Sequence, residues 1–227
     1  MAVLTWDQTG EKLYETGVQK GVLYPMDGAV YGKGVAWNGL TAVNETPSGA
    51  ESTKLYADDI KYLDIRSAEE FGATIEAYSS PEEFDACDGT ASLADGVNIG
   101  QQNRKGFGFC YRSTIGNDTE YNNYGYKLHI IYGCKAAPSE KSYATINDSP
   151  EAITFSWSIS TTPVNVKGMK PTANVTIDST KVAKEKLQQL EEILYGSESA
   201  DARLPLPDEI ISIVGVAASE PSQTPGG

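Results

Sequence analysis

Residue types that could carry out catalysis are few and scattered in this sequence. The single histidine, His129, lies in the middle of a segment with the alternating pattern of a β-strand. A Ser-His-Asp or Cys-His site would have to use this residue. Because a lone histidine on a strand is more commonly a surface or interface residue, we expect no catalytic and no metal-binding role for it.

The carboxylates and cysteines give equally weak evidence for a catalytic or metal-binding site. Adjacent carboxylates occur at 58–59, 69–70 and 82–83, but neighbours in sequence point to opposite faces of a strand and do not converge across a cleft. Cys87, Cys110 and Cys134 are widely separated and fit no zinc spacing, so we expect reduced thiols in or near the core. No phosphate-binding or hydrolase motif is present. The sequence therefore predicts a protein that is not an enzyme and holds no cofactor.

The charge balance narrows the possible partners. Acidic residues outnumber basic ones by 31 to 18, which gives a formal net charge of −13. This disfavours proteins that grip nucleic acid or anionic membranes, because both need clustered lysine and arginine. The N-terminus lacks the basic and apolar regions of a signal peptide, and no apolar run approaches a membrane span. We expect a soluble protein made in the cytoplasm.

Hydrophobic patterning predicts the elements that must position any site, and they are mostly strands. Large apolar residues alternate with small or polar ones over 107–111, 124–132 and 153–160. The first two of these segments flank a turn-rich connection and should form a hairpin. Weaker strand patterns cover 35–43, 60–65, 72–78, 97–101 and 173–177. Many short strands predict a mainly β fold, an antiparallel sandwich or small barrel.

Two helices and one unusual connection complete the expected organisation. Capping signals predict a short helix near 81–87, and an apolar stripe predicts a flanking α-helix at about 180–195. Residues 44–58 are polar and long for a hairpin loop. They predict either a floppy surface loop or an arm that becomes ordered against a neighbour. We expect one domain over 1–213 and a flexible tail over 214–227.

Tyrosine is the abundant aromatic residue, with thirteen copies against five phenylalanines. Tyrosine suits faces that are partly apolar and partly wet, which include protein interfaces and carbohydrate-binding surfaces. Combining the polar 44–58 segment with the tyrosine-rich 121–132 region gives a set of candidate subunit-interface residues. These are Glu45, Glu51, Lys54, Tyr56, Asp58, Asp59, Tyr121 and Tyr124.

Nine short sequence blocks run in order along most of the chain. They are YETGV (14–18), GVLY (21–24), GVAWNGL (34–40), EFGATI (70–75), GQQNRK (100–105), YGYKLH (124–129), APSEK (137–141), INDSPE (146–151) and DARLPLP (201–207). As an ordered set, these blocks resemble the major tail tube proteins of long-tailed bacteriophages and prophages. They mark a family and identify no reactive residue.

The resemblance implies hexameric rings that stack into a hollow virion tail tube, through which phage DNA passes without tight binding. It implies contacts with a tape-measure protein, a tail terminator and a distal tail or baseplate protein. Some relatives carry an additional immunoglobulin-like domain, for which residues 214–227 are too few. The inner tube of a contractile particle remains an alternative because it uses a related fold.

Two further classes compete with a tube subunit. The tyrosines and the β-architecture also fit a carbohydrate-binding or adhesin module, which would bind glycans as a monomer. A hydrolase using acidic residues would need two carboxylates converging in a pocket, at least one with a raised pKa. Regular hollow tubes in electron micrographs would separate these classes.

Overall fold

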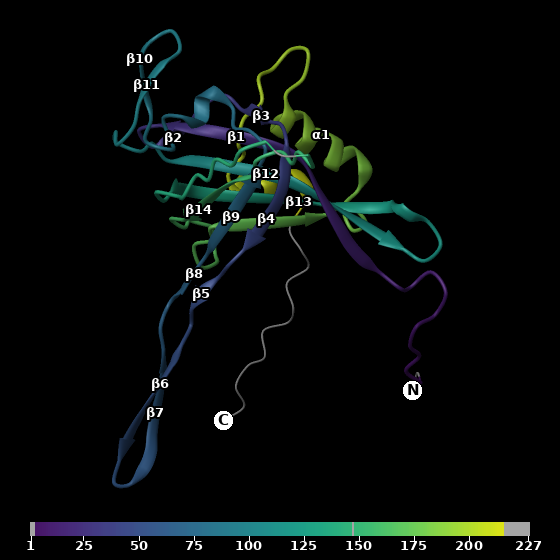
Figure 1. Ribbon diagram of the computed structural model, residues 1–227. Helices are drawn as coiled ribbons and strands as arrows, with labels where there is room; N and C mark the ends of the chain where they lie inside the picture. The colour runs from purple at the N-terminus through teal and green to yellow at the C-terminus, as the bar shows by residue number, and fades with distance from the viewer. Residues whose placement is uncertain (1–2, 147, 216–227) are drawn as a thin grey trace.

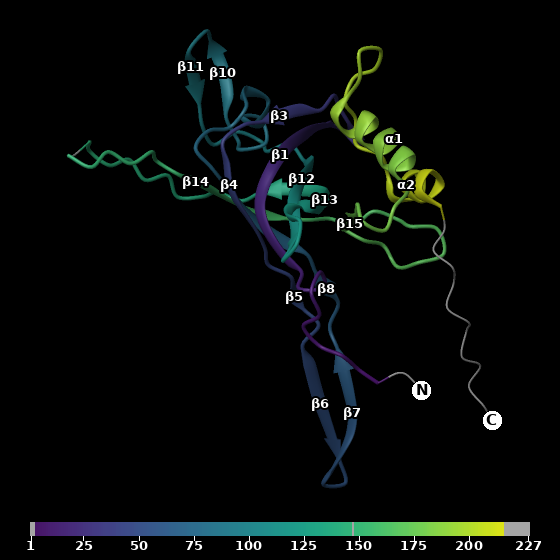
Figure 2. The same cartoon turned by 90° about the vertical axis from the view of Figure 1, so that its right-hand side faces the viewer.

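A computed structural model describes residues 3–146 and 148–215, and the protein is mainly β. Figures 1 and 2 show the elements in two views. The strands are β1 (Tyr14–Asp27), β2 (Val30–Tyr31), β3 (Val35–Trp37), β4 (Leu40–Glu45), β5 (Ser48–Gly49), β6 (Ser52–Ala57), β7 (Ile60–Arg66), β8 (Glu69–Glu70), β9 (Gly72–Ala77), β10 (Ala91–Ala94), β11 (Val97–Ile99), β12 (Phe107–Asn117), β13 (Tyr121–Ala136), β14 (Phe155–Ser160) and β15 (Asn174–Asp178). The helices are η1 (Glu82–Phe84), α1 (Lys184–Tyr195) and α2 (Pro207–Val214).

The long strand β13 joins two halves of one antiparallel sheet. Its first part pairs with β12 and β15, and β12 pairs in turn with β1. Its last residues, Lys135 and Ala136, pair with β14, which continues into β9 and β4. A register shift lies between the Phe107 and Phe109 positions of the β12–β13 ladder, where Gly133 has a φ of +58°. Such a bulge bends a strand, so β13 can pass from one half to the other.

The two halves face one another across an aromatic core, and the helices cover the opposite face of the first half. Phe109 and Ile131 from the first half pack with Ile75 and Trp157 from the second, and Trp37 also joins this core. On the other face, Leu128 and Ile130 pack with α1 and α2 residues such as Leu190. Figure 2 shows the resulting layers, with β4 and β14 on one side and the helices on the other.

The three segments with the clearest alternation are strands, as predicted. They correspond to β12, β13 and β14, and β12 pairs with β13 as the expected hairpin. Phe107, Phe109 and Tyr111 face the aromatic core, while Leu128 and Ile130 face the helices. The weaker candidates also contain strands, which are β3 with β4, β7, β9, β11 and β15.

The predicted helices differ from those observed in length and number. The flanking helix begins at Lys184 and not near 180, because the Asp178 carboxylate accepts bonds from the Thr180 N–H and hydroxyl and forms a turn. The predicted 81–87 helix is one 3₁₀ turn, η1, and no side chain caps it. Helix α2 was not predicted. It includes Val214, so the expected flexible tail begins too early, and residues 216–227 of that tail lie outside the described residues.

The three cysteines are buried and free, in agreement with the expected core thiols. Burial raises the pKa of the Cys87 thiol to about 11 and raises those of Cys110 and Cys134 further. These thiols therefore stay protonated near neutral pH and are poor nucleophiles.

Candidate assembly interface

A β-hairpin projects from the end of the sandwich, and its two strands, residues 52–57 and 60–66, contact chiefly each other. We call residues 46–71 the arm; its strands β6 and β7 form the hairpin, and β5 and β8 form a short neck at its base. Figures 1 and 2 both show the arm pointing away from the sheets and helices. At its tip, Asp58 and Asp59 both have positive φ, 51° and 62°. This conformation suits a two-residue hairpin turn, because it matches the twist of the two strands.

One face of the arm is apolar and exposed. Leu55 lies directly opposite Leu63, and Thr53 lies opposite Ile65. Because side chains alternate along a strand, these four residues share one face, which we call the apolar face of the arm. Leu55, Leu63 and Ile65 are 41%, 48% and 52% exposed. An isolated two-stranded hairpin is marginally stable in water, and exposed apolar patches mark interaction sites. The arm therefore has the features of a contact element.

The structure corrects the expectation of a polar loop over 44–58. These residues form the end of β4, the neck strand β5, the strand β6 and part of the tip turn. They are half of a hairpin that continues through β7 and β8. The expected floppy loop is wrong because Lys54 and its neighbours pair with residues 60–66 across the arm.

Five of the eight predicted interface residues lie along the arm and are exposed. They are Glu51, Lys54, Tyr56, Asp58 and Asp59. Tyr121 and Tyr124 lie instead on β13 beside the β12–β13 turn, which Figure 1 shows on another side of the molecule from the arm. The structure does not bring these two groups together, so they can contribute only to separate contacts.

Glu45, the remaining predicted interface residue, turns inward at the root of the arm. Its carboxylate accepts a hydrogen bond from the Tyr111 hydroxyl at 2.8 Å and lies 3.6 Å from Nδ1 of His129. The contact with His129, followed by the Tyr111 hydrogen bond, lowers the pKa of Glu45 against the opposing effect of burial. Glu45 therefore has contacts within its own chain, and its place at a subunit interface stays a prediction.

His129 also differs from the expected surface or interface residue. Its side chain is 14% exposed, its ring stacks on Tyr111 at 4.5 Å, and its Nε2 lies 2.9 Å from the Ser113 hydroxyl. Serine, histidine and glutamate in this order are the groups of an acyl-transfer triad. However, Ser113 lies inside β12 between the paired strands β1 and β13, where backbone N–H groups serve the sheet. Oxyanion binding requires N–H groups that are free. The arrangement of Ser113, His129 and Glu45 therefore suits holding the Glu45 side chain in place better than it suits acyl transfer.

Two further exposed apolar regions were not singled out from the sequence. In the segment before β1, Val3, Leu4 and Trp6 are 89%, 74% and 73% exposed. Between β13 and β14, residues 137–146 and 148–154 run away from the body and return (Figure 2), and Tyr143 and Ile146 are exposed there. Neither region has a periodic hydrophobic pattern. The only signal in the sequence is the presence of apolar residues among polar ones.

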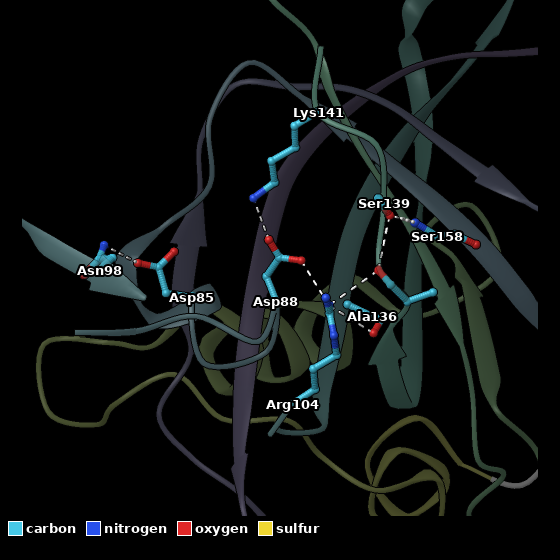
Figure 3. A network of polar contacts seen from close by, with 9 residues as sticks. Asp85, Asp88, Asn98, Arg104, Ala136, Ser139, Lys141 and Ser158 are labelled. Atoms are coloured by element: carbon cyan, nitrogen blue, oxygen red, sulfur yellow. Dashed lines mark hydrogen bonds and ion pairs between the residues drawn. The ribbon is translucent and has the colours of Figure 1, made fainter. Parts of the chain in front are cut away.

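A polar network fixes the base of the segment between β13 and β14. Figure 3 shows Asp88 between two cations, Arg104 at 3.1 Å and Lys141 at 2.7 Å. Arg104 also donates to the carbonyl of Ala136 at 3.3 Å. The Asp88 side chain is only 9% exposed, so these two cations replace the water that it lacks.

Replacing Asp88 with asparagine should loosen this segment. The change leaves Arg104 and Lys141 without their shared carboxylate, and we expect a loss of about 1–3 kcal/mol in the free energy of unfolding. Limited proteolysis should show faster cleavage between 138 and 146. The control is Asp85→Asn, because burial raises the pKa of that carboxyl and its side chain bonds only weakly to Asn98, at 3.5 Å. Equal cleavage of the two variants would contradict the role of Asp88.

The tip turn can be tested by giving it the residues that this conformation favours. Changing Asp58 to asparagine and Asp59 to glycine should stabilise the hairpin by about 1 kcal/mol, because these residues adopt positive φ with less strain. Amide hydrogen exchange of β6 and β7 would measure the gain. The double alanine variant also removes both charges but does not relieve the strain. If it stabilised the hairpin equally, charge repulsion and not turn geometry would be the cause.

Neither protein-family models nor curated proteins match the sequence. Among residues 3–146 and 148–215, no helix is long and apolar enough to cross a membrane. The same part of the chain contains no group of three or more acidic, histidine or cysteine side chains placed to hold a metal ion.

Proposed function

We propose that this protein is a structural subunit that assembles with copies of itself into a tube of the phage tail type. The observation that carries the proposal is the arm, whose apolar face cannot reach the core of its own chain. A second copy of the chain is the partner that we propose for this face, because it is present wherever the protein is and at the same concentration. Docking the apolar face there would bury Leu55, Leu63 and Ile65 and give the hairpin the support it lacks alone.

The sheet edges support a closed arrangement of subunits. In the described part of the chain, β15 pairs only with β13, and β4 pairs only with β9. Each edge therefore retains backbone groups that can pair with a strand of another copy. Pairing between non-equivalent edges makes head-to-tail contacts, which close into rings or extend into filaments. Hexameric rings and their stacking follow from the sequence resemblance.

The acidic composition is consistent with a conduit for DNA. With a net charge of −13, the protein repels a polyanion and does not bind it. The partners implied by the resemblance, which are the tape-measure, terminator and baseplate proteins, belong to the same proposal. A glycan-binding module remains the second candidate because Tyr56, Tyr62 and Tyr121 are each more than two-thirds exposed, at 68%, 68% and 69%.

Negative-stain electron microscopy of the purified chain tests the proposal directly. We expect hollow tubes of uniform diameter with a regular axial repeat. Sedimentation in parallel should show conversion from a small species to large assemblies as the concentration rises. A protein that stays monomeric at every concentration and binds immobilised glycans would overturn the tube proposal and favour the second candidate.

A further inference from the structure

A second hairpin, formed by β10 and β11, also carries an exposed apolar face. Ala91 lies opposite Ile99 in its ladder, and Leu93 and Val97 lie two positions away on the two strands. Because side chains alternate along a strand, these four residues share one face, which we call the apolar face of the β10–β11 hairpin. Leu93, Val97 and Ile99 are 68%, 51% and 36% exposed. This face is therefore in contact with water, as the apolar face of the arm is.

The β10–β11 hairpin turns its polar face toward the body of its own chain. Ser92 lies opposite Asn98 on that face, and both line a hollow together with Glu82 and Asp85. Figure 3 shows Asn98 directed at Asp85, and its side-chain amide donates to that carboxylate at 3.5 Å. A hairpin that covered the core of its own chain would have the opposite orientation, with its apolar residues inward. The observed orientation indicates a partner outside the chain.

The two apolar faces lie at opposite ends of the molecule. Figures 1 and 2 both show β10 and β11 at one end of the sandwich, while the arm strands β6 and β7 extend from the other end. The arm therefore cannot reach the β10–β11 hairpin of its own chain. When a second copy is placed end to end with the first, the arm of one copy points toward the β10–β11 hairpin of the other.

We propose that the apolar face of the β10–β11 hairpin is the receiving surface for the apolar face of the arm of a second copy. This inference rests on the proposed function and names the surface that the arm contacts on its partner. Each of the two faces presents three large aliphatic side chains to water. Two such faces can pack about 10 Å apart, as stacked sheets do. The contact would remove both apolar faces from water at once.

The composition of the β10–β11 hairpin suits an apolar partner. Between Thr90 and Gln102 the only charged residue is Asp95, although charged residues make up 22% of the chain. Docking at this hairpin therefore desolvates little charge. Its base is closed by the Gln102 N–H, which donates to the Gly89 carbonyl at 2.9 Å. Two-stranded hairpins are marginally stable alone, so the two hairpins would support each other once they are in contact.

This pairing gives assembly a direction. Each copy presents an arm at one end and a receiving face at the other, so the contact joins two different surfaces and can repeat along one axis. Contact between two arms would instead join equivalent surfaces and end with a dimer. It would also leave the apolar face of β10–β11 in water. The head-to-tail contact accounts for the exposed apolar residues at both ends of the molecule.

Two complementary variants test the pairing. Leu63→Lys damages the arm and leaves the receiving face intact, while Leu93→Lys damages the receiving face and leaves the arm intact. We expect each variant alone to stay monomeric in sedimentation, with a critical concentration at least about 100-fold above that of the original protein. Mixed in equal amounts, they should form a complex of one copy of each, because one intact arm meets one intact receiving face. The complex should not grow, because each of its free ends carries a lysine.

A control and a second measurement keep this test decisive. Ser92→Lys adds the same charge to the polar face of the same hairpin, and it should assemble within about threefold of the original protein. Short-lived pairs are captured by mixing Leu55→Cys and Val97→Cys chains with a bifunctional thiol reagent. The native cysteines are buried and stay out of its reach. The reagent should join one chain of each kind.

The outcomes separate the pairing from the proposed function. A mixture that stays monomeric and gives no crosslink between the two kinds of chain would overturn the pairing, and crosslinks that join two arms would do so as well. One-to-one complexes, with no tubes from the original protein, would support the pairing and contradict the tube. Tubes formed equally by the original protein and by Leu93→Lys would overturn the pairing and leave the proposed function standing.

Discussion

Replacing Leu63 with lysine on the apolar face of the arm is expected to abolish assembly while leaving the body folded. Leu63 is 48% exposed in the isolated chain, and it lies opposite Leu55 at the centre of that face. Docking on a second copy would bury the part of Leu63 that is exposed, and because full burial of a leucine contributes about 1.5–3 kcal/mol, docking gains roughly half of that. A lysine loses this contribution and adds a charge to be desolvated. The critical concentration for assembly, measured by sedimentation, should rise at least about 100-fold.

The matched control lies on the other face of the same hairpin. Lys54→Gln also changes the charge of the arm by one unit. Lys54 lies on the face away from Leu63, at the position opposite Asp64 in the β6–β7 ladder. We expect this variant to assemble within about threefold of the original protein, as for a surface substitution of less than 1 kcal/mol. Circular dichroism should show the same thermal midpoint for both variants. Tubes formed normally by Leu63→Lys would exclude the arm as the docking element.

The strands that the sequence predicted well are those in which large apolar residues alternate with small or polar ones. Strand β14 shows this pattern, with Trp157 and Ile159 buried and Ser158 and Ser160 exposed on the opposite face. Strand β1 lacks it. Val22, Leu23 and Tyr24 are buried in succession because β1 lies between the two cores, and register shifts interrupt its pairing near Gln19. Large apolar residues on both faces of a strand remove the alternation from which strands are predicted.

The sequence pointed to the segment that forms the arm but not to its hairpin structure. In the sequence, the polar segment 44–58 and the strand pattern 60–65 look like separate features. Two consecutive aspartates are not the usual turn signal, so the hairpin that joins them was missed. Glu45 and His129 lie 84 positions apart (129 − 45), and only the tertiary arrangement that places the end of β4 beside β12 and β13 brings their side chains together. Such a contact requires knowledge of the tertiary structure.

The largest loss of stability is expected from Trp157→Ala in the aromatic core. Trp157 is 2% exposed and packs edge-on against Trp37 and Phe84, at ring-centre distances of 5.4 Å in both cases. Its removal leaves a cavity between the two halves of the sheet, and we expect a loss of about 3–5 kcal/mol in the free energy of unfolding, measured by urea titration. Trp6→Ala is the control, because Trp6 is 73% exposed and its loss should change the stability by about 0.5 kcal/mol or less.

Phenylalanine at the same position separates the packing of Trp157 from its polarity. The indole N–H of Trp157 is buried and has no hydrogen-bond partner among the described residues. A buried donor without a partner is unfavourable by about 1–3 kcal/mol. Trp157→Phe removes that donor together with part of the ring, so its two effects oppose each other. We therefore expect a loss of about 1 kcal/mol, well below that of the alanine variant. Equal losses for the two variants would show that the indole N–H is satisfied in solution and that tryptophan is held there by a hydrogen bond as well as by packing.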